Sequence, residues 1–197
     1  MYLLPNAINY SKFFHKRNSK KLDAINLISV GSLIKRKNND FKLLILQNLI
    51  SSGFNASLTI IGDGPLRKEL IKKSFQLGVN DNVIFTGNVE NVNEHLIKSN
   101  FFIHTALYEP FGLVILEAMA SGLPCITLDG KGNRDFIKHG ENGYIFIKQD
   151  VQKFSNCIIN LFKNKNLYRK ISINGQNSAE QFDIVNYSKK LLTLYSK

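Results

Sequence analysis

The sequence has no tryptophan, only two cysteines and no long apolar run. Cys125 and Cys157 are too few for the dense disulfide framework of small secreted domains. No stretch reaches the roughly 18 consecutive apolar residues that a membrane-spanning helix needs, and no signal-peptide pattern is present. These absences exclude a disulfide scaffold and predict a reduced, cytoplasmic setting.

Acidic residues are also scarce. The chain has 15 Asp and Glu against 26 Lys and Arg, which gives a formal net charge of +11. Such a surface attracts nucleic acid, anionic lipid and phosphorylated ligands. However, the lysines are spread along the whole chain, and no RNP-like, zinc-finger or helix-turn-helix motif accompanies them. We therefore expect no nucleic-acid partner, while peripheral attachment to the inner face of the membrane stays open.

A metal site has little support in the sequence. The four histidines (His15, His95, His104 and His139) are scattered, and no Cys–His spacing typical of a metal site occurs. We expect each histidine to be structural or solvated rather than a ligand.

The hydrophobic pattern predicts one α/β domain. Of 197 residues, 44% are hydrophobic, enough for a sizeable core. Apolar strand candidates alternate with helical stretches and glycine turns, which favours a Rossmann-like, doubly wound parallel sheet of about six strands. The predicted strands are 24–30, 56–61, 82–86, 101–103, 125–128 and 144–147. The predicted helices are 40–52, a helix opened by Pro65, 92–98, a helix opened by Pro110 and Gly112, and helical stretches from 151 to the end.

The two ends of the chain differ from the middle. Residues 1–23 begin with a short apolar strand and a Pro-Asn turn and continue without the hydrophobic periodicity of a helix or strand. We therefore interpret them as a linker at a domain boundary. Residues 24–182 form the predicted domain, and 183–197 a C-terminal helix. We expect the long terminal helices to pack on the sheet.

The most informative stretch runs from His104 to Cys125. A buried strand leads into a loop with one acid, Glu109, and then into a helix that is apolar nearly all round and carries Glu117. A carboxylate in such a helix is costly without a partner. The loop at a strand's carboxyl end, before a helix, is where open parallel sheets bind ligands, and free N–H groups there favour phosphates.

A second loop has the residue pattern of a phosphate-binding site. Gly31 ends the first strand, a basic loop follows through Lys37, and an amphipathic helix begins near residue 40. A later turn, Gly62-Asp-Gly-Pro65, holds Arg67 where a dinucleotide fingerprint needs its third glycine. Two glycines near Asp135 predict a further wall of the same cleft.

The segment Glu109-Pro-Phe-Gly-Leu-Val-Ile-Leu-Glu117 resembles the Glu-x7-Glu motif of retaining GT-B glycosyltransferases, the family-4 group in particular. The resemblance covers about residues 3–195. It implies the donor-binding half of a GT-B fold, whose N-terminal acceptor domain is missing here, and a nucleotide diphosphate sugar as donor. It also implies transfer with retention, and we expect this half alone to be inactive. No Asp-x-Asp motif is present, and no cofactor or metal is expected.

The resemblance also assigns roles. Glu109 contacts donor-sugar hydroxyls, and Glu117 accepts hydrogen bonds from the ribose. Lys37 stabilises the leaving diphosphate; Ser32 stands where the family commonly has an arginine, and we hypothesise that Arg36 replaces it. The remaining donor-binding positions are Gly31, the base-contacting Val89, and the backbone N–H groups of Phe111, Gly112, Leu113 and Val114.

Three functions remain open from the sequence. The first is a glycosyltransferase donor domain used in polysaccharide or cell-surface glycan synthesis. The second is a non-catalytic nucleotide-sugar-binding module or accessory subunit, which Ser32 and the missing half favour slightly. The third, a basic nucleic-acid-binding domain, rests on net charge alone. The base, the sugar and the acceptor are not specified.

Overall fold

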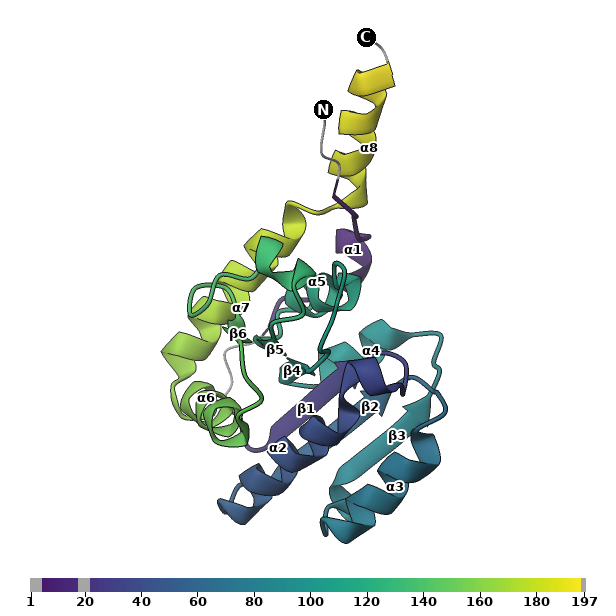
Figure 1. Cartoon of the computed structure of the whole chain (residues 1–197). Helices are drawn as coiled ribbons and strands as arrows, with labels where there is room; N and C mark the ends of the chain where they lie inside the picture. Colours follow the sequence, from purple (N-terminus) through teal and green to yellow (C-terminus); the bar gives the residue numbers. More distant parts are fainter. Residues whose placement is uncertain (1–4, 18–21, 196–197) are drawn as a thin grey trace.

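In the computed structural model, which describes residues 5–17 and 22–195, six parallel strands form one sheet (Figure 1). Their order is β3-β2-β1-β4-β5-β6, so the strand order reverses between β1 and β4. This confirms the predicted doubly wound parallel sheet, and ligands bind at such a reversal point in open α/β sheets. The strands are β1 Ile25–Val30, β2 Ala56–Ile61, β3 Val83–Gly87, β4 Phe101–His104, β5 Cys125–Leu128 and β6 Tyr144–Phe146.

Helices cover both faces of the sheet because successive strand residues point to opposite sides. Leu27 and Phe101 belong to one apolar core, and Ile28 and Phe102 to the other. The first core is covered by α2 Asn39–Ser51, α3 Arg67–Gln76 and α6 Val151–Lys163. The second core is covered by α1 Tyr10–Phe13, α4 Val92–Lys98 and α5 Leu113–Ala120, and α7 Lys165–Glu180 packs on α5 and α6.

Most predicted element boundaries lie within one residue of those in the structure. The predicted bounds of β2, α4 and β5 match residue for residue. Helix α3 begins at Arg67 rather than at Pro65, and β6 ends at Phe146, one residue before the predicted end. Ile147 is exposed. Three short 3-10 helices, which the pattern does not predict, occupy Lys35–Lys37, Asn80–Asn82 and Gly132–Asp135.

The polar stretch predicted as a linker is partly packed on the domain. This segment, residues 1–23, includes the short helix α1, whose Phe13 is buried. The Arg17 guanidinium donates to the backbone carbonyls of Leu96, Ser99 and Ser121, which fastens this segment beside α4 and α5. The apolar strand predicted at the start of the chain falls largely on residues 1–4, outside the described residues, and the division into domains stays a prediction.

The last helix, α8 (Ile184–Tyr195), departs from the expectation that the terminal helices pack on the sheet. None of its described residues is buried. In Figure 1 it projects away from the body of the domain. Its amphipathic pattern predicts a helix correctly, but the prediction of packing is wrong for α8.

Candidate active site

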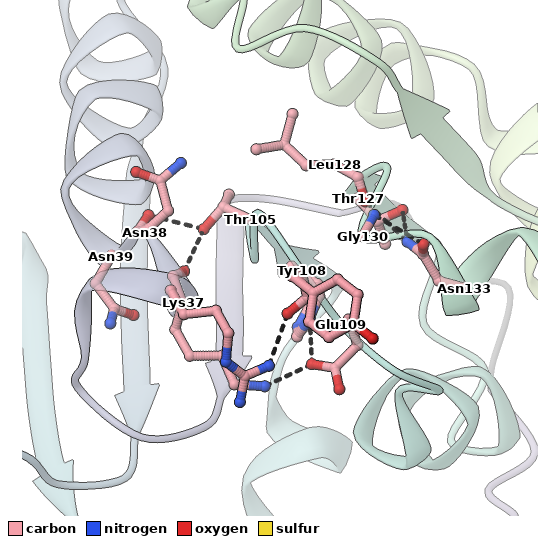
Figure 2. Close-up of polar contacts among 12 residues, drawn as sticks. Lys37, Asn38, Asn39, Thr105, Tyr108, Glu109, Thr127, Leu128, Gly130 and Asn133 are labelled. Carbon is pink, nitrogen blue, oxygen red and sulfur yellow. Dashed lines mark hydrogen bonds and ion pairs between the residues drawn. The ribbon is translucent and has the colours of Figure 1, made fainter.

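Two loops meet where the strand order reverses, one after β1 and one after β4. The backbone N–H of Leu107 donates to the carbonyl of Arg36 at 2.9 Å. The Thr105 hydroxyl contacts the carbonyls of Lys37 and Asn38 at 3.1 and 2.9 Å. Figure 2 shows how these contacts place Lys37 and Glu109 side by side. The tertiary pairing of the two loops therefore builds the site that the sequence predicts in two separate pieces.

Glycine at position 62 lets the loop after β2 approach the loop after β1. A Cβ at Gly62 would lie 2.3 Å from the carbonyl oxygen of Gly31, a distance that real Cβ contacts do not reach. A Cβ at Gly31 would instead meet the Lys37 side chain, at 3.6 Å from Cε. Gly31, a predicted donor-binding residue, thus lies against the side chain of Lys37, which is predicted to stabilise the diphosphate.

Glu109 is the centre of the site. Its Oε2 lies 2.5 Å from Lys37 Nζ and 3.0 Å from His104 Nε2. Burial alone would raise the pKa of Glu109, but the hydrogen bonds from His104 and Lys37 and their charges lower it to about 2. Glu109 is therefore ionised at neutral pH, and its Oε1 has no hydrogen bond among the described residues.

His104 is the site residue that the sequence reasoning misses. It is buried at the end of β4, and burial lowers its pKa to about 4 despite the hydrogen bond with Glu109. The ring is therefore neutral, and the proton on Nε2 donates to the Glu109 carboxylate. One available signal is its position, a polar side chain ending an apolar strand directly before the acidic loop.

The loop after β5 forms a third wall, as the two glycines predict. The N–H of Glu109 donates to the carbonyl of Gly130 at 2.7 Å, and the N–H of Gly132 donates to the carbonyl of Glu109 at 3.0 Å. The buried Asn133 side chain accepts from the N–H of Gly130. Lys131, between the glycines, has φ 81° and ψ −62°, a conformation that L-residues rarely adopt and that concentrates at functional sites.

Arg36 lies on the same 3-10 turn as Lys37. Its Nη1 donates to the carbonyl of Tyr108 at 2.7 Å, and the side chain is otherwise exposed. Ser32, which stands where the family commonly has arginine, is exposed on the same loop. The structure thus places a guanidinium beside the Glu109 loop although position 32 supplies none.

The start of α5 faces the same loops with unpaired N–H groups. Gly112 is the N-cap, with φ 98°, and no side chain caps the helix. Among the described residues, the N–H groups of Leu113 and Val114 have no acceptor. Phe111 is held by ring contacts with Phe136 and Phe182, at centroid distances of 5.7 and 5.9 Å. These N–H groups form a potential anion site.

Glu117 and Val89 lie outside the Glu109 cluster. Glu117 is half-buried on α5; burial raises its pKa, and the charge of Lys12 opposes this rise. Its carboxylate has no hydrogen bond among the described residues. Val89, after β3, is half-buried against the core on the α5 side. The two carboxylates of the motif therefore have separate surroundings, and the roles of Glu117 and Val89 stay predictions.

The depressed pKa of Glu109 predicts a loss of stability in acid. A carboxylate whose pKa falls on folding stabilises the fold above its unfolded pKa, and this contribution disappears as the pH falls toward its folded pKa. We expect Glu109→Gln to lower the free energy of unfolding by about 2 kcal/mol at pH 7 and by much less near pH 3. Urea unfolding of both proteins at the two pH values measures this difference. Glu141→Gln, at an exposed loop acid, is the control, and an equal loss by both variants at pH 7 contradicts the prediction.

Comparisons with known proteins identify the family of the chain. The family model for glycosyl transferases group 1 matches residues 11–178. The chain belongs to this family. It is 34% identical over 142 residues to N-acetyl-alpha-D-glucosaminyl L-malate synthase of Bacillus anthracis, covering 72% of this chain and 36% of that protein. It is 29% identical over 210 residues to the UDP-Gal:alpha-D-GlcNAc-diphosphoundecaprenol alpha-1,3-galactosyltransferase of Escherichia coli, covering 98% and 53%.

A solved structure shows the same fold. Anabaena HepE in complex with UDP and glucose superposes with a TM-score of 0.84 at 22% identity, covering 98% of this chain and 55% of that one. The fold of this chain is thus the Rossmann-like half of a GT-B protein. The chain spans about a third to about half the length of these three proteins.

Two structural features bear on metals and membranes. Within 5–17 and 22–195, no three or more His, Cys, Asp and Glu side chains gather into a possible metal site. In the same ranges no helix combines the length and apolar character needed to cross a membrane. Independence from metal stays a prediction.

Proposed function

We propose that this chain is the donor-binding domain of a retaining glycosyltransferase that moves a sugar from a nucleotide diphosphate sugar to a saccharide or lipid-linked acceptor. The observation that carries the proposal is the ionised Glu109, held by Lys37 and His104 at the reversal point of the sheet. Support comes from HepE, solved with UDP and glucose. The name of the Escherichia coli relative specifies a UDP-sugar donor and a diphosphoundecaprenol-linked acceptor, which supports a role in cell-surface glycan synthesis.

In this proposal, different site residues bind the sugar and the diphosphate. The free Oε1 of Glu109 accepts a hydrogen bond from a sugar hydroxyl, while its Oε2 stays bound to Lys37 and His104. Lys37 and Arg36 stabilise the charge that develops on the leaving diphosphate, the work that a metal ion does in other transferases. The N–H groups of Leu113 and Val114 add to this stabilisation.

The nucleoside is bound at the edge of the same site. In this proposal the Glu117 carboxylate accepts hydrogen bonds from the ribose hydroxyls. The backbone near Val89 contacts the base, and the backbone at Gly31, Ser32, Phe111 and Gly112 leaves room for the phosphates and sugar. The acceptor would be bound by a second domain, in the same full-length chain or in a separate subunit, so this chain alone is expected to be inactive. We place the reaction in the cytoplasm, with the basic surface suited to peripheral contact with the membrane.

Thermal unfolding with UDP, GDP and ADP tests the donor site. A ligand at a hundredfold its dissociation constant adds about 2.7 kcal/mol of stability, which for a domain of this size raises Tm by roughly 5–10 °C. We expect one nucleotide to give this rise and Glu117→Ala to remove it.

No rise with any nucleotide contradicts the donor site in this chain. A rise with one nucleotide but no transfer by the chain joined to its acceptor domain instead favours a non-catalytic nucleotide-sugar-binding module. The observation behind that second candidate is Ser32, at a position where relatives commonly hold a diphosphate-binding arginine.

A further inference from the structure

Lys42, in the first turn of α2, is a buried lysine that the proposed mechanism does not use. Its residue is 3% exposed, and its Nζ donates to the side-chain oxygen of Asn39 at 2.7 Å. Asn39 is itself 2% exposed. Lysine is almost never fully buried without a charged partner, and here the partner is a neutral amide.

The charges around Lys42 are repulsive rather than compensating. The charge of Lys37, on the turn before α2, lowers the pKa of Lys42. The charge of Lys42 in turn lowers the pKa of His104, at the end of β4. The acid nearest in sequence, Asp40, instead pairs with Lys73 of α3 at 3.5 Å. Burial, and then the charge of Lys37, lower the pKa of Lys42 to about 7.

Asp40 and the exposed Glu69 line the same pocket as Asn39, but neither carboxylate forms an ion pair with Lys42 among the described residues. The Nδ2 of Asn39 and the Oγ of Ser29 are buried without a hydrogen-bond partner among the described residues. Ser29 belongs to β1, where alternation puts it on the same face as the core residues that pack on α2. On α6, the buried Oγ of Ser155 also lacks a hydrogen-bond partner among the described residues. Lys153 of the same helix forms an ion pair with Asp150 at 3.7 Å. Among the described residues, no carboxylate is paired with Lys42, so a bound anion would favour its charged form.

We propose that Lys42 takes up a proton when the donor diphosphate binds at the loop preceding α2, and thereby acts as a positioning residue for that site. This inference rests on the proposed donor site. The diphosphate carries the negative charge that the free site lacks, and it is held by Lys37, five residues before Lys42. Its field favours the charged amine, which then donates to Asn39 at the start of α2 and strengthens the attraction for the anion.

The test is the pH dependence of donor binding. Isothermal titration calorimetry with UDP-, GDP- and ADP-glucose, at constant salt from pH 6 to pH 8.5, gives the dissociation constant. These donors are diphosphate diesters, whose phosphates do not titrate in this range. If binding raises the pKa of Lys42 by about one unit, affinity falls about five- to tenfold between pH 6 and pH 8.5, and a larger rise gives a larger fall. Buffers of different ionisation enthalpy then report proton uptake on binding.

Two variants isolate Lys42. Lys42→Met fills a similar volume without a titrating group, and Lys42→Gln keeps a donor for Asn39 if the first variant does not fold. Both are expected to bind the donor with little dependence on pH. Lys73→Met, at a part-exposed lysine on the neighbouring helix, is the matched control and should keep the wild-type pH dependence.

The outcomes separate this inference from the proposed function. Binding by the wild type without dependence on pH, or with the same dependence in Lys42→Met or Lys42→Gln, overturns the role of Lys42 and leaves the donor site intact. No binding of any of the three donors overturns the donor site and this inference together.

Discussion

Lys37→Met is expected to weaken binding of the donor nucleotide by about ten- to a hundredfold. Hydrogen bonds to charged groups contribute about 1.5–3 kcal/mol, and each 1.4 kcal/mol corresponds to a factor of ten in affinity. Lys37 Nζ is held 2.5 Å from Glu109 Oε2, with 13% of the side chain exposed. The ammonium is therefore already in place before the diphosphate arrives, and little side-chain entropy is lost on binding. Isothermal titration calorimetry with UDP at fixed salt measures the loss.

Lys35→Met is the matched control for this prediction. Lys35 lies on the same 3-10 turn, but it is exposed and makes no ion pair among the described residues. It reports the general attraction of a basic loop for an anion, which salt screens strongly. A loss of affinity as large as that of Lys37→Met would mean that binding depends on the overall charge of the loop and not on the geometry at Glu109.

Much of the fold follows from local pattern. The apolar run Ala56–Ile61 between polar turns predicts β2 without knowledge of its neighbours, and Cys125–Leu128 predicts β5 in the same way. Gly31 and Gly112 mark the two loops that form the site, since both adopt positive φ where the chain leaves regular structure. Because each loop follows a strand of a parallel sheet, the pattern also places them at the same edge.

The contacts within the site depend on tertiary pairing and are not encoded by any local pattern. The position of His104 marks it as an unusual residue, but its contact with Glu109 forms only when the loop between them folds back. The same holds for Arg17, whose three backbone acceptors lie 79 to 104 residues away. A polar residue within or next to an apolar strand is therefore a signal to test as a site residue and not only as a structural one.

Helix α8 shows a second limit. Its apolar residues recur at helical spacing, and a helix does form at Ile184–Tyr195. Periodicity gives the helix and its apolar face, but it does not say which surface covers that face. Within the described residues the sheet does not cover it, so the prediction of packing fails while the prediction of secondary structure holds.

Gly132→Ala is expected to destabilise the domain and displace the Glu109 loop. A Cβ at this position would lie 2.0 Å from the carbonyl oxygen of Pro110 and 2.7 Å from that of Glu109. Both are backbone atoms, so no flexible side chain can move away to relieve the overlap. We expect the free energy of unfolding to fall by about 3 kcal/mol, and Tm to fall by roughly 6–12 °C. Differential scanning calorimetry measures the change.

Gly140→Ala separates the overlap from the backbone effect. Gly140 has φ 77°, but a Cβ there would meet no atom within 4 Å, so only the left-handed backbone is penalised, by about 1–2 kcal/mol. If Gly132→Ala is no more destabilising than this control, the two loops can move apart at little cost. Glu109 would then not be held rigidly between Lys37 and the loop after β5. A larger loss in Gly132→Ala, together with weaker donor binding, means that the close approach of these backbones fixes the carboxylate on which the proposed chemistry depends.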